Sequence, residues 1–227
     1  MTVKKLTELC IFDLDGTLLD TVESIRYNLN TVLSRYGIEG ITKEETKVFV
    51  GNGARKLVYR SLASRGIDTG SEEGEMLCDR ITKKYNALYD SDPFYLTEPY
   101  CGIKDAIKEL YLRGIKLAVL SNKPDPTVKQ LIAKHFGGVF DIVLGATDKM
   151  KLKPDPESAL YICESLGVSP ENTAYFGDTG TDMRTAKNYG AGKTVGVLWG
   201  FRGKDELLEN GADTVICDPY YIPGSTD

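Results

Sequence analysis

Near the amino terminus the chain reads Leu9-Cys10-Ile11-Phe12-Asp13-Leu14-Asp15-Gly16-Thr17-Leu18. The apolar residues at the start of this stretch predict a buried strand, and Gly16 marks a turn soon after it. Extended backbone would point the side chains of Asp13 and Asp15 to one side. We therefore expect a pair of carboxylates at the end of the first strand.

Short runs of β-branched and aliphatic residues recur along the chain, and each is followed by a polar turn and a stretch with helical period. These runs are residues 9–12, 116–120, 141–144, 173–176, 194–197 and 214–216. Strands that alternate with helices indicate a parallel sheet covered on both faces. The expected fold class is α/β, with a Rossmann-like parallel-sheet core.

The interval from about residue 21 to residue 88 breaks this rhythm and predicts helices only. Apolar residues fall at helical spacing in three stretches, namely 22–36, 54–62 and 77–88, and Thr42 with Glu45 forms a capping-box pattern for a further helix after the first. Turn-rich segments near residues 16–20 and 91–102 can act as hinges. We expect a core domain of residues 1–18 and 96–227, an inserted helical domain of residues 19–95, and a loose tail at 219–227.

Composition argues against several classes of protein. The 227 residues carry 28 Lys and Arg against 33 Asp and Glu, a net charge of −5, which disfavours binding to nucleic acid. No apolar stretch approaches the roughly 20 residues that span a membrane, and residues 1–9 lack the apolar segment of a signal peptide. The five cysteines contain no CxxC spacing, which argues against a disulfide framework or a zinc site. We expect a cytoplasmic protein.

A second acidic cluster follows the strand at 173–176, in the stretch Phe176-Gly177-Asp178-Thr179-Gly180-Thr181-Asp182. Asp182 alone could be the N-cap of the next helix. Ligands of parallel sheets bind at the carboxyl ends of the strands, so Asp13, Asp15 and Asp178 can meet there. Clustered carboxylates without Cys or His select a hard cation, and Mg²⁺ fits best when it also binds a substrate phosphate.

Two further segments place polar groups at strand ends. The stretch Leu120-Ser121-Asn122-Lys123 offers a hydroxyl and an amide, and Lys153 stands before Pro154, which we expect to start a helix. Each segment in isolation has a plain alternative as a polar loop or a solvated lysine. Together with the carboxylates they supply the groups that phosphoryl transfer requires.

These residues, in this order, resemble the four motifs of the haloacid dehalogenase superfamily of phosphatases. The matching stretches are D-L-D-G-T-L, L-S-N-K, K-L-K-P-D-P and G-D-T-G-T-D, and the inserted helices resemble the small helical cap of that superfamily. Within it the chain is most similar to phosphoglycolate phosphatases, because Phe49-Val50-Gly51-Asn52-Gly53-Ala54-Arg55 resembles their specificity loop. Cys101, where such chains usually have proline, departs from the pattern.

The resemblance implies a role for each motif residue. Asp13 would attack phosphorus, and Asp15 would protonate the leaving oxygen and then activate water. Thr17, Ser121, Asn122 and Lys153 would bind the phosphoryl group. Mg²⁺ would be held by side-chain oxygens of Asp13 and Asp178 and by the backbone carbonyl of Asp15, with Asp182 acting through water or by fixing Lys153.

The resemblance also implies a substrate, a small phosphorylated metabolite such as 2-phosphoglycolate. Gly51, Asn52 and Arg55 of the cap would contact it, with Arg55 pairing with its carboxylate. The alternative for Arg55 is a solvated position on its helix. The chain would act as a monomer or dimer, without nucleic acid or membrane.

Rival functions remain at this point. A sugar-phosphate phosphatase or phosphomutase and a pyrophosphatase would use the same core. A dehalogenase needs neither a second acid nor a metal, so Asp15 would be superfluous in it. A catalytically silent interaction protein would leave the clustered charges unexplained, because they reduce stability without serving a reaction.

Overall fold

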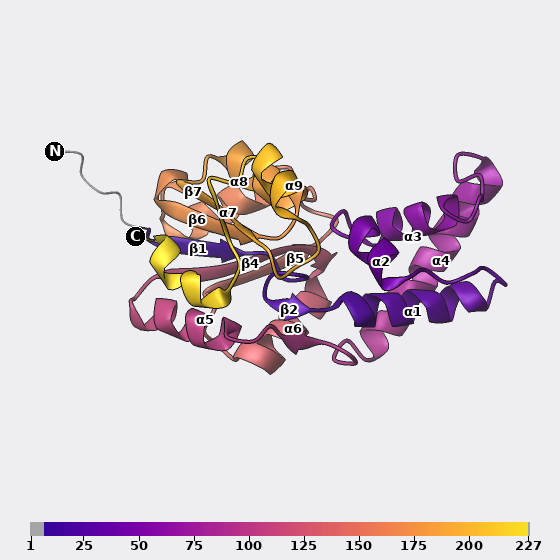
Figure 1. Ribbon diagram of the computed structural model, residues 1–227, viewed down its shortest axis with the longest axis horizontal. Helices are drawn as coiled ribbons and strands as arrows, with labels where there is room; N and C mark the ends of the chain where they lie inside the picture. Colours follow the sequence, from indigo (N-terminus) through magenta and orange to yellow (C-terminus); the bar gives the residue numbers. More distant parts are fainter. Residues whose placement is uncertain (1–6, 227) are drawn as a thin grey trace. The chain divides into compact units, whose positions relative to one another are not determined.

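The computed structural model describes residues 7–226, and the chain divides into two compact units (Figure 1). One unit comprises the chain up to Asp20 and from Pro99 onward, and the other comprises Thr21–Glu98. Their roles as a catalytic core and a cap stay predictions. The expectation that no signal peptide is present rests largely on residues 1–6, which lie outside the described residues.

A parallel sheet forms the centre of the first unit. Its strands are β1 (Leu9–Phe12), β4 (Lys116–Pro124), β5 (Ile142–Ala146), β6 (Thr173–Gly177), β7 (Lys193–Val197) and β8 (Thr214–Ile216), in the order β5-β4-β1-β6-β7-β8. This confirms the predicted α/β class. The chain builds outward from β1 through β4 to β5 and then returns to the other side of β1 with β6. Such a reversal is where ligands bind in open α/β sheets.

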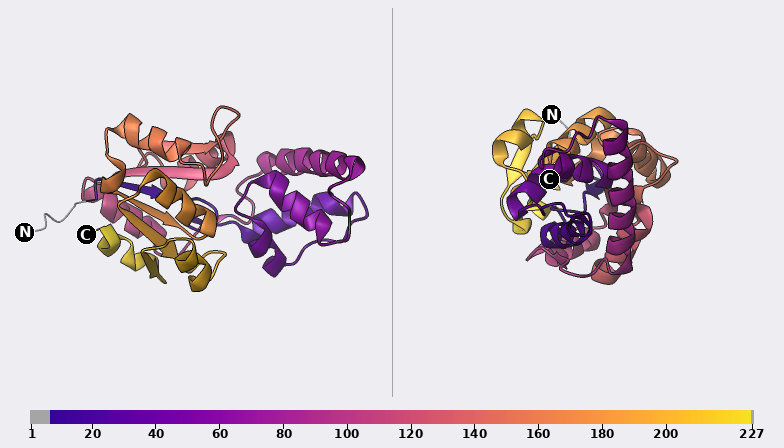
Figure 2. Two further views of the ribbon diagram at one scale, coloured as in Figure 1. Left: turned by 90° about the horizontal axis from the view of Figure 1, so that it is seen from above. Right: turned by 90° about the vertical axis from the view of Figure 1, so that its right-hand side faces the viewer.

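Helices cover both faces of this sheet (Figures 1 and 2). They are α5 (Ile103–Leu112), α6 (Asp125–Phe136), α7 (Glu157–Leu166), α8 (Gly180–Tyr189) and α9 (Lys204–Glu209). Alternate residues of β1 serve the two faces, because Cys10 and Phe12 pack in the cluster with α5 and α6, whereas Leu9 and Ile11 pack with α7 and α8. Burial on both faces explains why the strand is a continuous apolar run.

The second unit is helical, as predicted. It contains α1 (Val22–Ser34), α2 (Lys43–Phe49), α3 (Ala54–Ala63) and α4 (Glu72–Ser91). The predicted capping box begins α2: the Glu45 amide donates to Thr42 Oγ1 over 3.1 Å, and the Thr42 amide donates to Glu45 Oε2 over 2.8 Å. Two short strands, β2 (Leu19–Asp20) and β3 (Glu98–Pro99), pair where the chain passes between the units.

Three local predictions were wrong. Helix α7 begins at Glu157 rather than at Pro154, which follows a cis peptide bond. Strand β4 continues to Pro124, beyond the predicted end at Leu120, with a register shift after Leu120, so Ser121 to Lys123 form an irregular strand end. The tail at 219–226 is packed, because Ile222 is fully buried and the Arg113 guanidinium donates to the Pro223 carbonyl.

Within residues 7–226, no helix is both long enough and apolar enough to cross a lipid bilayer.

Candidate active site

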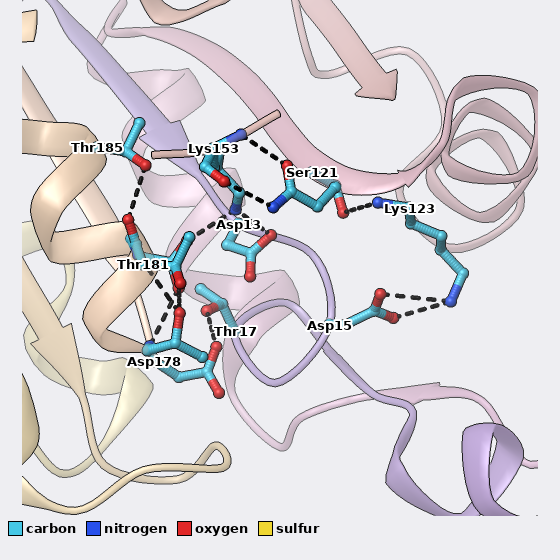
Figure 3. A network of polar contacts seen from close by, with 12 residues as sticks. Asp13, Asp15, Thr17, Ser121, Lys123, Lys153, Asp178, Thr181 and Thr185 are labelled. Carbon is cyan, nitrogen blue, oxygen red and sulfur yellow. Dashed lines mark hydrogen bonds and ion pairs between the residues drawn. The ribbon is translucent and has the colours of Figure 1, made fainter. Parts of the chain in front are cut away.

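The site lies at the carboxyl ends of β1, β4 and β6, where the strand order reverses (Figure 3). Asp13 follows β1 directly, and its amide donates to the Phe176 carbonyl of β6 over 2.9 Å. That bond fixes the backbone of Asp13 against the strand that precedes Asp178. The Asp13 side chain is buried, and one of its oxygens contacts Lys153.

Lys153 is the cation of this site and is 5% exposed. Its Nζ lies 2.8 Å from Asp13 Oδ1 and 2.7 Å from Asp182 Oδ1. Burial acts to lower the pKa of Lys153, but the carboxylates of Asp13 and Asp182 outweigh burial and raise this pKa well above its usual value. The lysine therefore stays charged and holds the position of Asp13.

Asp182 has its hydrogen-bonding capacity filled by protein groups. Its Oδ1 accepts from Lys153 Nζ over 2.7 Å and from the Tyr175 hydroxyl over 3.3 Å, and its Oδ2 accepts from the Thr179 amide and hydroxyl over 3.0 and 2.6 Å. An ionised carboxylate has about four lone-pair positions. Asp182 is thus suited to fixing Lys153, as expected, rather than to binding an ion directly. Thr179, and not Asp182, is the N-cap of α8.

Carboxylate oxygens of Asp13, Asp178 and Asp182 lie within 4.8 Å of one another, and all three residues are buried. Burial and the neighbouring Asp182 raise the pKa of Asp13 to about 7. Burial also raises the pKa of Asp178 well above its usual value, with Asp182 and Asp13 adding to the effect. Lys153 offsets only part of this negative charge. An oxygen-only set of crowded carboxylates is suited to a divalent cation, which would relieve their repulsion.

Asp178 is oriented from two sides but retains capacity to bind an ion. Thr17 Oγ1 donates to its Oδ1 over 3.0 Å, and the Phe201 amide donates to its Oδ2 over 2.8 Å. Each oxygen therefore keeps a further lone pair, in contrast to those of Asp182. The Thr17 hydroxyl was expected to bind phosphate, and the structure instead directs it to Asp178 (Figure 3). A phosphate contact by Thr17 stays a prediction.

The irregular end of β4 supplies Ser121 and Asn122. Ser121 Oγ accepts from the Lys123 amide over 3.2 Å, so its O–H can donate to a phosphoryl oxygen. Both polar atoms of the Asn122 amide bind the backbone of Lys153, at 2.8 Å to its N–H and 3.2 Å to its carbonyl. Asn122 thus positions Lys153, and a contact of Asn122 with phosphate stays a prediction.

Asp15 has a partner that the sequence did not indicate. Lys123 Nζ lies 3.1 Å and 3.3 Å from its two carboxylate oxygens, and Figure 3 shows Asp15 directed toward Lys123. The side chain of Lys123 is 7% exposed and that of Asp15 is 19% exposed. Asp13 and Asp15 therefore contact different cations, although alternation along a strand predicted that both would point the same way. The chain leaves the extended conformation after Phe12.

Tyr175 is a second residue that sequence reasoning missed. It is fully buried in β6, and Lys153 Nζ donates to its hydroxyl over 3.3 Å. Only its position on the strand that precedes Asp178 could have suggested a role in the site, because a tyrosine within an apolar strand is typical of a core.

Comparison with known proteins agrees with this geometry. The family model described as haloacid dehalogenase-like hydrolase matches residues 10–197, most of the chain. The chain belongs to the haloacid dehalogenase-like hydrolases. It is 32% identical over 228 residues to a phosphoglycolate phosphatase of Pseudomonas fluorescens, with 98% of this chain and 81% of that protein covered. It is 31% identical over 218 residues to phosphoglycolate phosphatase 1 of Pseudomonas aeruginosa, with 94% and 77% covered.

Solved structures of this hydrolase family give the same result. A protein from Lactobacillus delbrueckii subsp. bulgaricus, proposed to be a phosphoglycolate phosphatase, superposes with a TM-score of 0.90 and 30% identity, and 97% of this chain and 98% of that chain are covered. A haloacid dehalogenase-like family protein from Streptococcus pneumoniae shares the fold, with a TM-score of 0.84 and 20% identity over 98% and 99% of the two chains.

The second unit of this hydrolase contains the loop expected to contact substrate. Gly51 and Gly53 both have positive φ, and Gly53 is the N-cap of α3. The Asn52 side chain is engaged by Arg60, whose guanidinium donates to Asn52 Oδ1 and to the Phe49 carbonyl, each over 2.7 Å. Arg60 therefore sets the shape of this loop, a role that sequence reasoning missed.

Arg55 lies at the surface of α3. Its Nε is 2.7 Å from Asp79 Oδ1 of α4, and its side chain is 49% exposed. An ion pair this exposed is weak and can be exchanged for another carboxylate. A contact between Arg55 and substrate stays a prediction.

Proposed function

We propose that this hydrolase is a Mg²⁺-dependent phosphoglycolate phosphatase of the cytoplasm that works through an aspartyl-phosphate at Asp13. The observation that carries the proposal is the buried Lys153 ammonium, 2.8 Å from the candidate nucleophile and anchored by Asp182. Such a lysine can offset the negative charge of a phosphate brought beside a carboxylate. The names of the relatives support the choice of substrate.

The chain's own residues divide the reaction between them. Asp13 attacks phosphorus and the ester bond breaks, and Asp15 gives its proton to the departing oxygen. Asp15, now ionised, takes a proton from the water that attacks the phosphoaspartate, which releases phosphate and restores Asp13. The Ser121 hydroxyl and Lys153 Nζ bind the phosphoryl oxygens throughout.

The Asp15 carboxylate must leave Lys123 and take up a proton from solvent before it can act as the acid for the departing oxygen. Because the ion pair joins a long lysine side chain to a partly exposed carboxylate, rotation of either side chain can separate them. Binding of substrate would therefore accompany a rearrangement at Asp15.

Side-chain oxygens of Asp13 and Asp178 and the carbonyl of Asp15 would hold the Mg²⁺. When bound, the ion neutralises charge on the phosphoryl group and orients it toward Asp13. Asp178 suits this role because Thr17 and Phe201 orient it without filling its lone pairs.

Removal of divalent cations is expected to lower the rate of phosphate release by at least about 100-fold. The reason is that the cation stabilises the charge of the transition state by several kcal/mol, and this stabilisation is lost. Mg²⁺ should restore the rate, and Ca²⁺ should inhibit because its larger shell positions the reactants poorly. The measurement is phosphate release from 2-phosphoglycolate in EDTA, with and without added ion. Full activity in EDTA, unaltered by Mg²⁺, would overturn the proposal.

A melting curve gives an independent check of the same prediction. Burial raises the pKa of Asp13 from 3.8 to about 7, so without a cation the stability that this group contributes is lost as pH rises through about 7. Mg²⁺ should raise the melting temperature, and more so at about pH 8 than at about pH 5. An equal shift at both pH values would contradict binding at these carboxylates.

Replacement of Arg55 by Ala is expected to raise KM for 2-phosphoglycolate by about tenfold, the effect of one lost charge-assisted pair. KM for p-nitrophenyl phosphate should change little, because that substrate has no carboxylate. Steady-state kinetics on both substrates measures the difference.

Asp79→Asn is the matched control, since it breaks the same ion pair but leaves the guanidinium in place. It should keep a wild-type KM or lower it. Equal losses on both substrates in Arg55→Ala, or the same loss in Asp79→Asn, would show that Arg55 does not bind the substrate carboxylate. A strong preference for pyrophosphate or a hexose phosphate would show that 2-phosphoglycolate is not the substrate. The proposed roles of the core residues would be unchanged.

A further inference from the structure

The segment after β7, Trp199-Gly200-Phe201, packs directly on the candidate metal ligand Asp178. The Phe201 amide donates to Asp178 Oδ2 over 2.8 Å. The indole Nε1 of Trp199 donates to the Thr17 carbonyl over 3.0 Å. Thr17 in turn donates its hydroxyl to Asp178 Oδ1 over 3.0 Å. One loop therefore acts on both oxygens of the same carboxylate.

Gly200 is what allows this approach. A Cβ at Gly200 would lie 2.4 Å from Asp178 Oδ2, 2.4 Å from Asp178 Cβ and 2.4 Å from the Gly16 carbonyl oxygen. A Cβ at Gly16 would lie 2.3 Å from Asp178 Oδ2. The Asp178 carboxylate is thus enclosed between two glycines from loops that follow different strands. A side chain at either position would displace it.

The two glycines differ in one respect. Gly16 has a φ of +86°, so its backbone alone favours glycine, whereas Gly200 is not among the positive-φ glycines. No positive φ constrains Gly200, and contact with Asp178 and Gly16 is what excludes a side chain there. This makes Gly200 the cleaner position for a test.

We infer that Trp199, Gly200 and Phe201 are positioning residues that set Asp178 for binding of the divalent cation. The inference rests on the proposed function, since that function places the cation at Asp178. Groups around a metal ligand that orient it typically change metal affinity 10- to 100-fold when they are altered. The loop acts through Asp178 and needs no contact with substrate.

The experiment measures Mg²⁺ binding by isothermal titration calorimetry on the full chain, without substrate. Gly200→Ala is expected to raise the Kd for Mg²⁺ by at least about tenfold. Trp199→Phe keeps an aromatic ring and removes the bond to the Thr17 carbonyl, so its Kd should rise by about fivefold, the effect of one hydrogen bond. Circular dichroism and melting curves without metal establish that each variant folds.

Gly203→Ala is the matched control in the same loop, because no heavy atom lies within 4 Å of a Cβ at Gly203 and its φ is −86°. It should keep the wild-type Kd. Wild-type affinity in a folded Gly200→Ala would overturn the inference. If Gly200→Ala does not fold, wild-type affinity in Trp199→Phe would overturn it. Absence of Mg²⁺ binding to the wild-type chain would instead contradict the proposed function.

Discussion

Asp13→Asn should abolish turnover and leave the fold intact. The amide has the size of the carboxylate but is not a nucleophile, so the expected loss is on the order of 10⁴-fold or more. The Asp13 carboxylate lies in a crowded set with Asp178 and Asp182, and loss of one negative charge there relieves repulsion. Without metal the variant should melt at or above the wild-type temperature. Phosphate-release assays and melting curves measure the two effects.

The opposite pattern would contradict the assignment of Asp13. Near wild-type activity in Asp13→Asn would exclude this residue as the nucleophile. A variant that loses activity only because it unfolds would show a lowered melting temperature, and Asp13→Ser, which is smaller and also carries no charge, would then be measured in its place.

Asp15→Asn should lower turnover by about 10²–10⁴-fold, the usual contribution of a general acid and base. Asn cannot deliver a proton to the departing oxygen or take one from water. The Lys123 side chain would lose its ion pair, but the amide oxygen of the variant can still accept a hydrogen bond from Lys123 Nζ, so the fold should persist. The measurement is the rate of phosphate release at saturating substrate.

Asp105→Asn, on the exposed side of α5, is the control for loss of one negative charge and should keep full activity. Lys123→Met removes the ion pair but keeps the Asp15 carboxyl group. If the ion pair only holds Asp15 in place, the rate of phosphate release should fall less in Lys123→Met than in Asp15→Asn. A fall in turnover of less than about threefold in Asp15→Asn would show that Asp15 is not the general acid.

Strand β1 could be predicted because it is buried on both faces and is therefore a continuous apolar run. Strand β8 was also predicted with its observed bounds, although it lies at the edge of the sheet and its first residue is exposed. The capping box of α2 was also predictable, since it depends on two residues three apart. The rule that parallel strands present their carboxyl ends at one edge predicted that Asp13, Asp15 and Asp178 can meet, and Asp13 and Asp178 do lie close together. Asp15 instead contacts Lys123, and the contact of Lys153 with Asp182 was expected only from the family resemblance.

The polar partners could not be predicted, because they join residues far apart in sequence. Thr17 and Asp178 are 161 positions apart, and Lys123 and Asp15 are 108 apart. A sequence motif shows which residue types are present. It does not show which acceptor oxygen each hydrogen-bond donor will contact in the folded chain. The register shift in β4 has the same origin, since pairing with β5 determines how Ser121 and Lys123 are directed.

Gly200 shows most clearly that contacts between residues far apart in the sequence could not be predicted. In the sequence it stands between two aromatic residues, and those aromatic residues indicate packing or a loop. Its function becomes visible only when Asp178 is found 2.4 Å from where a Cβ would be.

In the proposed reaction the phosphoryl group forms a covalent bond to Asp13 before water releases it. The direct measurement is acid quenching of Asp15→Asn during turnover of 2-phosphoglycolate with Mg²⁺, followed by peptide mapping by mass spectrometry. Asp15→Asn should accumulate the intermediate, because its hydrolysis lacks a base. We expect one added phosphoryl group on the peptide that contains Asp13, and its loss on treatment with hydroxylamine. A phosphoryl group on another residue, or none on any peptide while the wild-type chain releases phosphate, would contradict it.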